Sequence, residues 1–137
     1  MKPLDKIIIN KDTSFNPIWI MRQAGRYLPE FRAIRKKNPD FINLCLNDDL
    51  SSEITLQPIK RFDLDAAIIF SDILMLPYGL GQKVEFEKNF GPKLGELNLN
   101  KIAKIDEIDF VEKIYPVYKA IQKVSSNISL NLSLIHI

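Results

Sequence analysis

The residues best suited to binding an anion lie in one short part of this sequence. Four of its five arginines, Arg22, Arg26, Arg32 and Arg35, fall within 14 residues. A guanidinium group is flat and permanently charged, and it holds a carboxylate or a phosphate through two parallel hydrogen bonds. Arg32 and Arg35 belong to a basic helix end, which is commonly solvated. Arg22 and Arg26 are four residues apart, so their side chains lie on one side of the chain and form a candidate anion site.

One carboxylate is placed to act together with them. Asp72 follows the apolar run 66–70, just as Arg22 follows the apolar run 17–21. Both runs are predicted to be strands buried on both faces, which is typical of a parallel sheet. In such sheets the loops that leave the carboxyl ends of the strands form the ligand site. We therefore expect Arg22, Arg26 and Asp72 to meet at one rim. The plain alternatives are exposed charges for the arginines and a turn-capping role for Asp72.

The elements that must position these side chains follow from hydrophobic periodicity and from proline and glycine. Besides the two strands, the pattern predicts helices over 28–38, 40–46, 48–62 and 105–124, a hairpin ending near 92 and a third strand within 128–137. Strands that alternate with helices indicate an α/β fold. Cys45 lies among apolar residues of a predicted helix and is assigned to the core. The single histidine, His136, has no partner nearby, so no metal site is expected.

Composition excludes several classes of protein. The chain has 137 residues, 46% of them hydrophobic, and a formal net charge of +2. These values fit one soluble globular domain and give no argument for a nucleic-acid partner. The longest apolar runs have five residues, far fewer than the roughly 18 to 20 of a membrane span. One cysteine allows no internal disulfide, and the N-terminus has no secretory pattern, so a cytoplasmic protein is expected.

Two stretches of the sequence resemble a known family. Residues 17–30, PIWIMRQAGRYLPE, closely resemble the N-terminal motif of the uroporphyrinogen decarboxylase family. Residues 70–74, FSDIL, resemble the family's second active-site stretch. The likeness is nearly continuous from about Pro17 to Leu94. A match that holds Trp, Met, two Arg and Gly in fixed order is far more specific than a lone glycine pattern.

The resemblance implies an enzyme of haem biosynthesis. The family converts uroporphyrinogen III to coproporphyrinogen III by removing carbon dioxide from four acetate side chains, with no metal or organic cofactor. It implies a (β/α)8 TIM barrel, usually a homodimer. By this likeness Arg22, Arg26 and Asp72 are the catalytic residues: the arginines hold substrate carboxylates, and Asp72 accepts hydrogen bonds from the pyrrole N–H groups. The rest of the implied substrate-binding surface comprises Gln23, Ala24, Gly25 and Phe70.

Length limits what the resemblance implies for this chain. A (β/α)8 barrel takes about 250 residues, so residues 1–137 are expected to be the N-terminal part, with the first two or three βα units. The tail, about 126–137, departs from the family pattern, and the fragment alone is expected to be inactive. Two alternatives stay open: a non-catalytic module that binds porphyrinogen-like polyanions, and a barrel relative that transfers methyl groups to corrinoid proteins. The run Met21–Arg26 argues against the second alternative.

Overall fold

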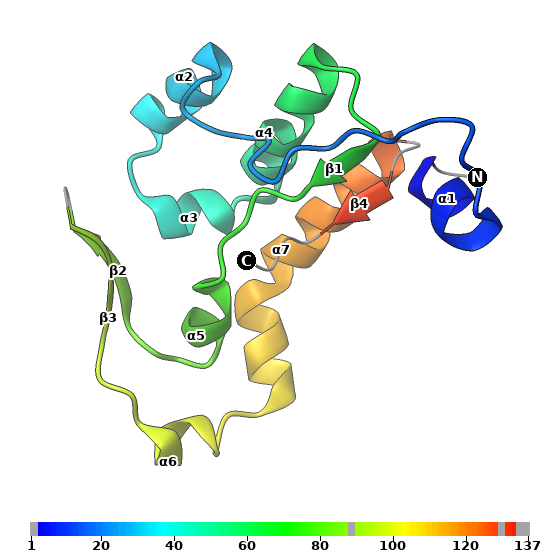
Figure 1. The fold of residues 1–137 in the computed structure, drawn as a ribbon. Helices are drawn as coiled ribbons and strands as arrows, with labels where there is room; N and C mark the ends of the chain where they lie inside the picture. Colours follow the sequence, from blue (N-terminus) through cyan, green and yellow to red (C-terminus); the bar gives the residue numbers. More distant parts are fainter. Residues whose placement is uncertain (1–2, 88–89, 129–130, 134–137) are drawn as a thin grey trace.

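The chain folds into a mixed arrangement of helices and short strands (Figure 1). The computed structural model describes residues 3–87, 90–128 and 131–133. Within these ranges, β1 (Ala66–Ile68) pairs with β4 (Asn131–Ser133), and β2 (Val84–Glu87) pairs with β3 (Gly91–Leu94). The first pair is parallel and the second is an antiparallel hairpin. The described residues therefore combine helices with strands, two of them parallel, as expected for the α/β class.

The parallel pair lies beside α4 (Asp48–Arg61) and α7 (Glu107–Asn127) (Figure 1). Ala66 lies opposite Asn131, and Ile68 lies opposite Ser133. Parallel neighbours need a long crossover, and here α7 supplies its last part and leads into β4. All three residues of β1 are buried. The predicted third strand is thus present at 131–133, whereas 129–130 and 134–137, including His136, lie outside the described residues.

The predicted strand at 17–21 is absent. The chain is irregular there, and the side chains of Ile18, Trp19, Ile20 and Met21 are 45–59% exposed, so the expectation of a strand buried on both faces was wrong. The reason lies in the hydrogen bonds of the neighbouring backbone. The carboxylate of Asp65 accepts the Ile18 N–H (2.7 Å), and the Ile18 carbonyl accepts the Asp65 N–H (2.8 Å).

The backbone groups on the edge of β1 that faces residues 17–21 already have hydrogen-bond partners. The side chain of Gln23 donates to the Ala66 carbonyl and accepts from the Ile68 N–H. These are the backbone groups that a parallel neighbour would use on that edge. A side chain therefore takes the place of the expected ladder.

Besides α7, six helices lie in the described part of the chain. Their bounds are α1 (Pro3–Asn10), α2 (Pro29–Lys37), α3 (Phe41–Cys45), α4 (Asp48–Arg61), α5 (Met75–Gly79) and α6 (Leu99–Ile102). Asp40 caps α3 by accepting the Asn43 N–H at 3.0 Å. The cap of α4 is Asn47, which accepts the Leu50 N–H at 2.9 Å. Asn47 performs this role because its oxygen stands one residue before the first helical turn.

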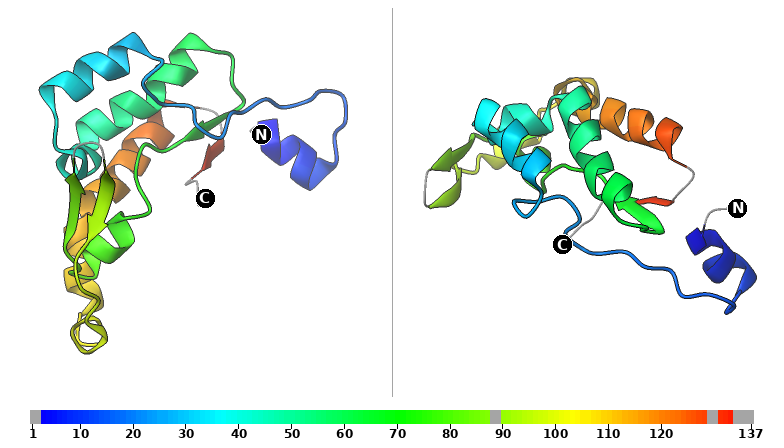
Figure 2. Two further views of the ribbon diagram at one scale, coloured as in Figure 1. Left: turned by 60° about the vertical axis from the view of Figure 1, so that its left-hand side comes forward. Right: turned by 90° about the horizontal axis from the view of Figure 1, so that it is seen from above.

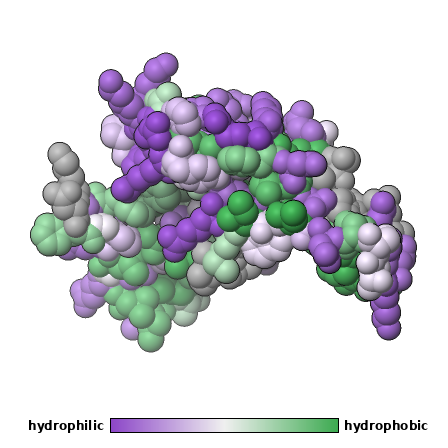
Figure 3. All heavy atoms as spheres, turned by 45° about the horizontal axis from the view of Figure 1, so that its top comes forward, coloured by the Kyte–Doolittle hydropathy of each residue, from purple (hydrophilic) through white to green (hydrophobic). Residues whose placement is uncertain are grey.

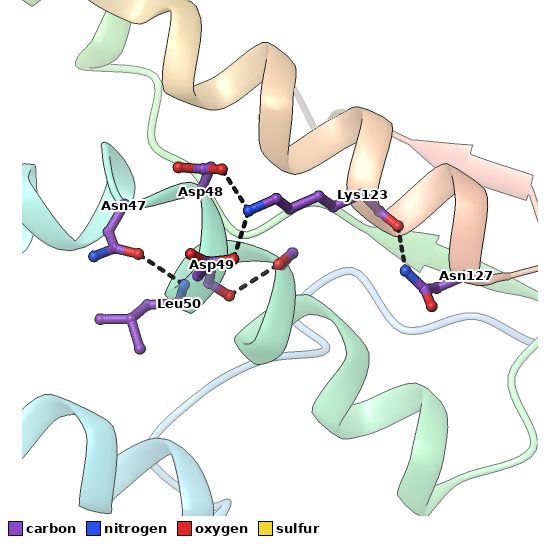
Figure 4. A network of polar contacts seen from close by, with 7 residues as sticks. Asn47, Asp48, Asp49, Leu50, Lys123 and Asn127 are labelled. Atoms are coloured by element: carbon purple, nitrogen blue, oxygen red, sulfur yellow. Dashed lines mark hydrogen bonds and ion pairs between the residues drawn. The ribbon is translucent and has the colours of Figure 1, made fainter.

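Helix α4 organises the packing, because it contacts α2, α7 and β1 (Figure 2). On one side Ile54 joins a buried cluster with Leu28, Phe31 and Leu44. A second cluster joins Ile69, after β1, to Ala120 and Val124 of α7. Lys123 of α7 also reaches Asp48 and Asp49 at the start of α4 (Figure 4). The segment that follows β1 is therefore held between two packed helices.

Candidate functional site

A cavity of about 860 Å³ opens where β1 ends. Its walls come from the turn after residue 20, from the segment that follows β1, from the start of α5 and from one face of α7. The apolar wall includes Phe41, Phe110, Ile114 and Val117. The polar groups stand at Arg22, Gln23, Ser71 and Asp72. An apolar cavity with a few converging polar groups is the usual form of a small-molecule site.

The structure brings together five of the seven residues that the sequence assigns to the site. Arg22, Gln23, Ala24, Phe70 and Asp72 all line the cavity. Gly25 and Arg26 do not line it. The expected first strand is missing, but the Ile18 N–H donates to Asp65 and the Gln23 amide donates to Ala66. These hydrogen bonds keep the 18–23 segment beside β1 and bring the residues together.

Asp72 combines a capping contact with an available oxygen. Its Oδ1 accepts the Leu74 N–H at 2.9 Å, and its carbonyl accepts the Met75 N–H at 3.0 Å. The alternative of a capping aspartate is therefore correct for one oxygen. Oδ2 makes no hydrogen bond to any residue that the structure describes, and the side chain is half-buried. One fixed carboxylate oxygen can thus accept a hydrogen bond from a ligand in the cavity.

Arg22 and Gln23 play different parts although they are adjacent. The Arg22 side chain is exposed at the cavity, and its guanidinium makes no hydrogen bond or ion pair within the described ranges. Gln23 is 1% exposed, and its amide donates to the Ala66 carbonyl at 2.6 Å and accepts the Ile68 N–H at 2.9 Å. The guanidinium is free to bind an anion, whereas the Gln23 amide is committed to β1.

Arg26 lies in a separate hollow. The turn from Gly25, whose carbonyl accepts the Leu28 N–H at 3.0 Å, redirects the chain toward α2. Arg26 there lines a hollow of about 400 Å³ with Arg32, Arg35 and Lys36. Figure 3 shows hydrophilic side chains gathered on the side where α2 lies. The expectation that Arg22 and Arg26 share one rim is therefore not met, because the intervening turn separates their side chains.

Arg35 lines the smaller hollow, and Cys45 packs behind the wall of the larger cavity. The Arg35 guanidinium lies 5.5 Å from the ring centre of Phe41, and Arg35 is half-buried instead of fully solvated. Cys45 is completely buried, as predicted for a core residue. Burial, followed by the nearby charge of Asp72, raises the pKa of the Cys45 thiol to about 12, while Arg35 acts in the opposite direction. The thiol is therefore a neutral packing group.

Sequence reasoning missed two hydroxyl groups next to the site. Ser51 and Thr55 of α4 are buried and hydrogen-bond the backbone of Phe70. The sequence did contain a signal: Ser51 and Thr55 are one helical turn apart on a predicted helix. The same part of that helix carries Ile54, which belongs to a buried cluster, and Leu50, which packs against that cluster. Hydroxyl residues are uncommon on a buried helix face unless they have a partner.

The described residues contain neither a metal-ligating cluster nor a membrane-spanning helix. No three His, Cys, Asp or Glu side chains in these ranges are grouped so that they could hold a metal ion. None of the helices in the described part of the chain is long and apolar enough to cross a membrane.

The sequence matches one protein family along almost its whole length. The model of the family described as uroporphyrinogen decarboxylase (URO-D) covers residues 2–136. Relatives that carry the name uroporphyrinogen decarboxylase include one from Chelativorans sp., 47% identical over 119 residues, and one from Agrobacterium fabrum, 43% identical over 122 residues. These alignments cover 87% and 89% of this chain but 35% and 36% of the relatives. The chain spans about a third of the length of the curated relatives it matches.

Proposed function

Because the chain belongs to the uroporphyrinogen decarboxylase family, we propose that its protein decarboxylates the four acetate side chains of uroporphyrinogen III to give coproporphyrinogen III. The observation that carries this proposal is the shared cavity of Arg22 and Asp72 at the end of β1. Arg22 supplies a guanidinium group and Asp72 supplies a carboxylate oxygen, and neither has a side-chain partner among the described residues. A tetrapyrrole with acidic side chains and central N–H groups needs both.

The proposed whole protein is a (β/α)8 barrel in the cytoplasm that works as a homodimer. Residues 1–137 form its N-terminal part, with a tail at about 126–137 that differs from the family pattern. Two observations support the barrel: β1 and β4 are parallel neighbours, and α7 leads back into β4. In barrels of this kind the ligand site lies at the carboxyl ends of the strands, where the 860 Å³ cavity opens.

The proposed chemistry uses Asp72 as a fixed negative charge. A proton first adds to a ring carbon of one pyrrole, which makes that ring cationic. The bond between the acetate methylene and its carboxyl carbon then breaks, its electron pair neutralises the ring, and carbon dioxide leaves. A proton adds to the methylene carbon as the ring carbon loses its own. Asp72 Oδ2 accepts the pyrrole N–H and stabilises the cationic ring in the transition state. The protonated pyrrole is itself the electron acceptor, so the proposed reaction steps use neither a metal nor an organic cofactor.

The arginines bind the acidic side chains of the substrate. Arg22 holds a carboxylate at the cavity, next to Ala24 and Phe70. Arg26 and the basic residues of α2 attract the remaining carboxylates and orient the approach of the polyanion. Gln23 and Gly25 shape the turn that carries both arginines. Because a guanidinium keeps its charge after each loss of carbon dioxide, the same groups can bind the successive intermediates.

The test compares Asp72→Asn and Arg22→Ala in the full-length protein. We expect Asp72→Asn to lower kcat by about 100-fold, since an amide cannot stabilise the cationic ring as a carboxylate does. Arg22→Ala should mainly raise KM, by about tenfold, because it removes binding common to substrate and transition state. The measurement is the rate of coproporphyrinogen formation.

Asp63→Asn is the matched control, since Asp63 is an exposed aspartate outside the cavity. It should retain normal turnover. Wild-type turnover by Asp72→Asn contradicts the charge-stabilising role. Substrate binding without any coproporphyrinogen formation by the unaltered protein favours the non-catalytic binding module instead.

A further inference from the structure

Two buried hydroxyl groups of α4 hold the backbone of Phe70. The Phe70 N–H donates to Thr55 Oγ1 at 2.8 Å, and the Phe70 carbonyl accepts from Ser51 Oγ at 2.5 Å. The Thr55 hydroxyl donates in turn to the Ser51 carbonyl at 2.7 Å. Thr55 is 0% and Ser51 1% exposed. The Thr55 hydroxyl therefore both donates and accepts, which leaves it a single orientation.

These hydrogen bonds to α4 take the place of strand pairing just beyond the end of β1. β1 ends at Ile68, so Phe70 has no strand neighbour within the described residues. Buried backbone N–H and C=O groups must nonetheless find partners. Because both polar groups of Phe70 bond to one helix, its position is fixed relative to α4. The packing of α4 against α7 and β1 makes that helix a rigid support.

Asp72 lies two residues beyond this fixed point. Its Oδ1 bonds to the Leu74 N–H, so the carboxylate is also fixed on its far side. The segment 70–74 is thus held at its start by α4 and near its end by its own turn. Asp72 Oδ2 lies between these two fixed points, at the 860 Å³ cavity, and has no hydrogen-bond partner among the described residues.

We propose that Ser51 and Thr55 are positioning residues that set Asp72 against the pyrrole N–H groups of the substrate. The proposal rests on the proposed function, which assigns the charge of Asp72 its role. Neither hydroxyl lines the cavity, so neither touches substrate. They act through the backbone of Phe70. A displacement of about 1 Å in a reacting group is enough to cost on the order of 100-fold in rate.

The experiment uses three variants of α4 in the full-length protein. Thr55→Val keeps the shape of the side chain and removes the hydroxyl, Thr55→Ser keeps the hydroxyl, and Ser51→Ala removes the second contact. We expect Thr55→Val and Ser51→Ala to lower kcat at least tenfold, with KM for uroporphyrinogen changed less than twofold, since Arg22 is held by a different segment. Thr55→Ser should retain most of the wild-type kcat.

Ser52→Ala is the matched control. Ser52 is also a buried serine of α4, but its hydroxyl donates to the Asp49 carbonyl of its own helix and does not reach Phe70. It should leave kcat within twofold of wild type. Hydrogen exchange at residues 70–75, followed by mass spectrometry, should be faster in Thr55→Val and unchanged in Ser52→Ala.

A double-mutant cycle with Asp72→Asn separates positioning from stability. If Thr55 acts through Asp72, adding Thr55→Val to Asp72→Asn should lower kcat by less than a further twofold. A full tenfold further loss in that background overturns the proposal, and so does a Thr55→Val variant with normal kcat. Wild-type turnover by Asp72→Asn alone overturns the proposed role of Asp72 and the positioning role with it, whereas an impaired Asp72→Asn beside a normal Thr55→Val overturns the positioning role only. Failure of the unaltered protein to form coproporphyrinogen is the separate outcome that overturns the proposed function.

Discussion

Gln23 shows how one buried side chain can replace a strand. Its amide satisfies the Ala66 carbonyl and the Ile68 N–H at the same time, and both groups belong to the buried strand β1. We expect Gln23→Leu, which has nearly the same volume, to lower the free energy of unfolding by about 3 kcal/mol, because it leaves two buried backbone groups without partners. The measurement is urea unfolding followed by circular dichroism.

Gln122→Leu provides the control, since Gln122 is exposed on α7 and its side chain is in none of the hydrogen bonds given for the described residues. That variant should unfold within about 0.5 kcal/mol of wild type. An equal midpoint for Gln23→Leu and wild type would mean that these two hydrogen bonds contribute nothing to stability. The type and place of Gln23 in the motif indicated a site residue. They could not indicate that its amide would turn toward β1, because that depends on which edge of β1 is left unpaired.

At the scale of the elements, the ion pairs between α4 and α7 couple two helices far apart in the sequence. Lys123 Nζ lies 2.6 Å from Asp48 Oδ2 and also contacts Asp49 (Figure 4). The hydrogen bond from Lys123 lowers the pKa of Asp48 below its ordinary 3.8, and the bonds to both carboxylates raise the pKa of Lys123 above 10.5. We expect Lys123→Met to lower the urea midpoint at pH 7, and less so in high salt.

The signs of these shifts set the pH window. A lowered carboxyl pKa stabilises the fold above pH 3.8, and the effect disappears as the pH falls through the folded value. A raised lysine pKa stabilises it below pH 10.5, and the effect disappears as the pH rises through the folded value. The difference between Lys123→Met and wild type should therefore be present at pH 5–9 and decrease as the pH falls below 3.8. Lys104→Met, at an exposed lysine in no ion pair of the described residues, should show no such profile.

Sequence periodicity identified the helices better than it identified the strands. Proline at 29 and the Asn38-Pro39 pair bounded α2 correctly, because these residues act through local backbone geometry. The run 17–21 has the composition of a buried strand, but strand formation depends on a partner with free backbone groups. Gln23 instead meets β1 through its side chain, and the backbone of Ile18 bonds to the carboxylate and the N–H of Asp65, just before β1. No local pattern indicates such contacts.

For the whole molecule, the sequence predicted that Arg22 and Asp72 would line one cavity, on the assumption that residues 17–21 form a strand beside β1. The strand is absent, and the hydrogen bonds of Ile18 and Gln23 keep the segment in place instead. The sequence could not predict that Arg26 would lie over α2, since that depends on the three-dimensional path of the turn at Gly25. The cavity itself is also a property of the assembled fold. Its walls come from residues 21 to 117, and α7 supplies the apolar side.

Cys45 reports on the integrity of that assembly, because its buried cluster includes residues of α3 and α5 and packs against Phe70 and Val117. It is the single cysteine of the chain and is 0% exposed, with a pKa of about 12 against an ordinary 9.0. The thiolate is the reactive form of cysteine. We therefore expect a thiol reagent at pH 8 to label Cys45 only when the protein unfolds locally or globally, and the labelling rate should rise with the urea concentration.

The same shift has a consequence for stability. The unfolded thiol loses its proton near pH 9, whereas the folded thiol keeps it to about pH 12, so the unfolded state gains ionisation free energy as the pH rises through that window. Stability should fall from pH 9 upward in the wild type and fall less steeply in Cys45→Ala, when both are measured as urea midpoints. Rapid stoichiometric labelling of the native protein at pH 8 would show instead that α3 and α5 separate readily, and that the wall of the cavity they support is open.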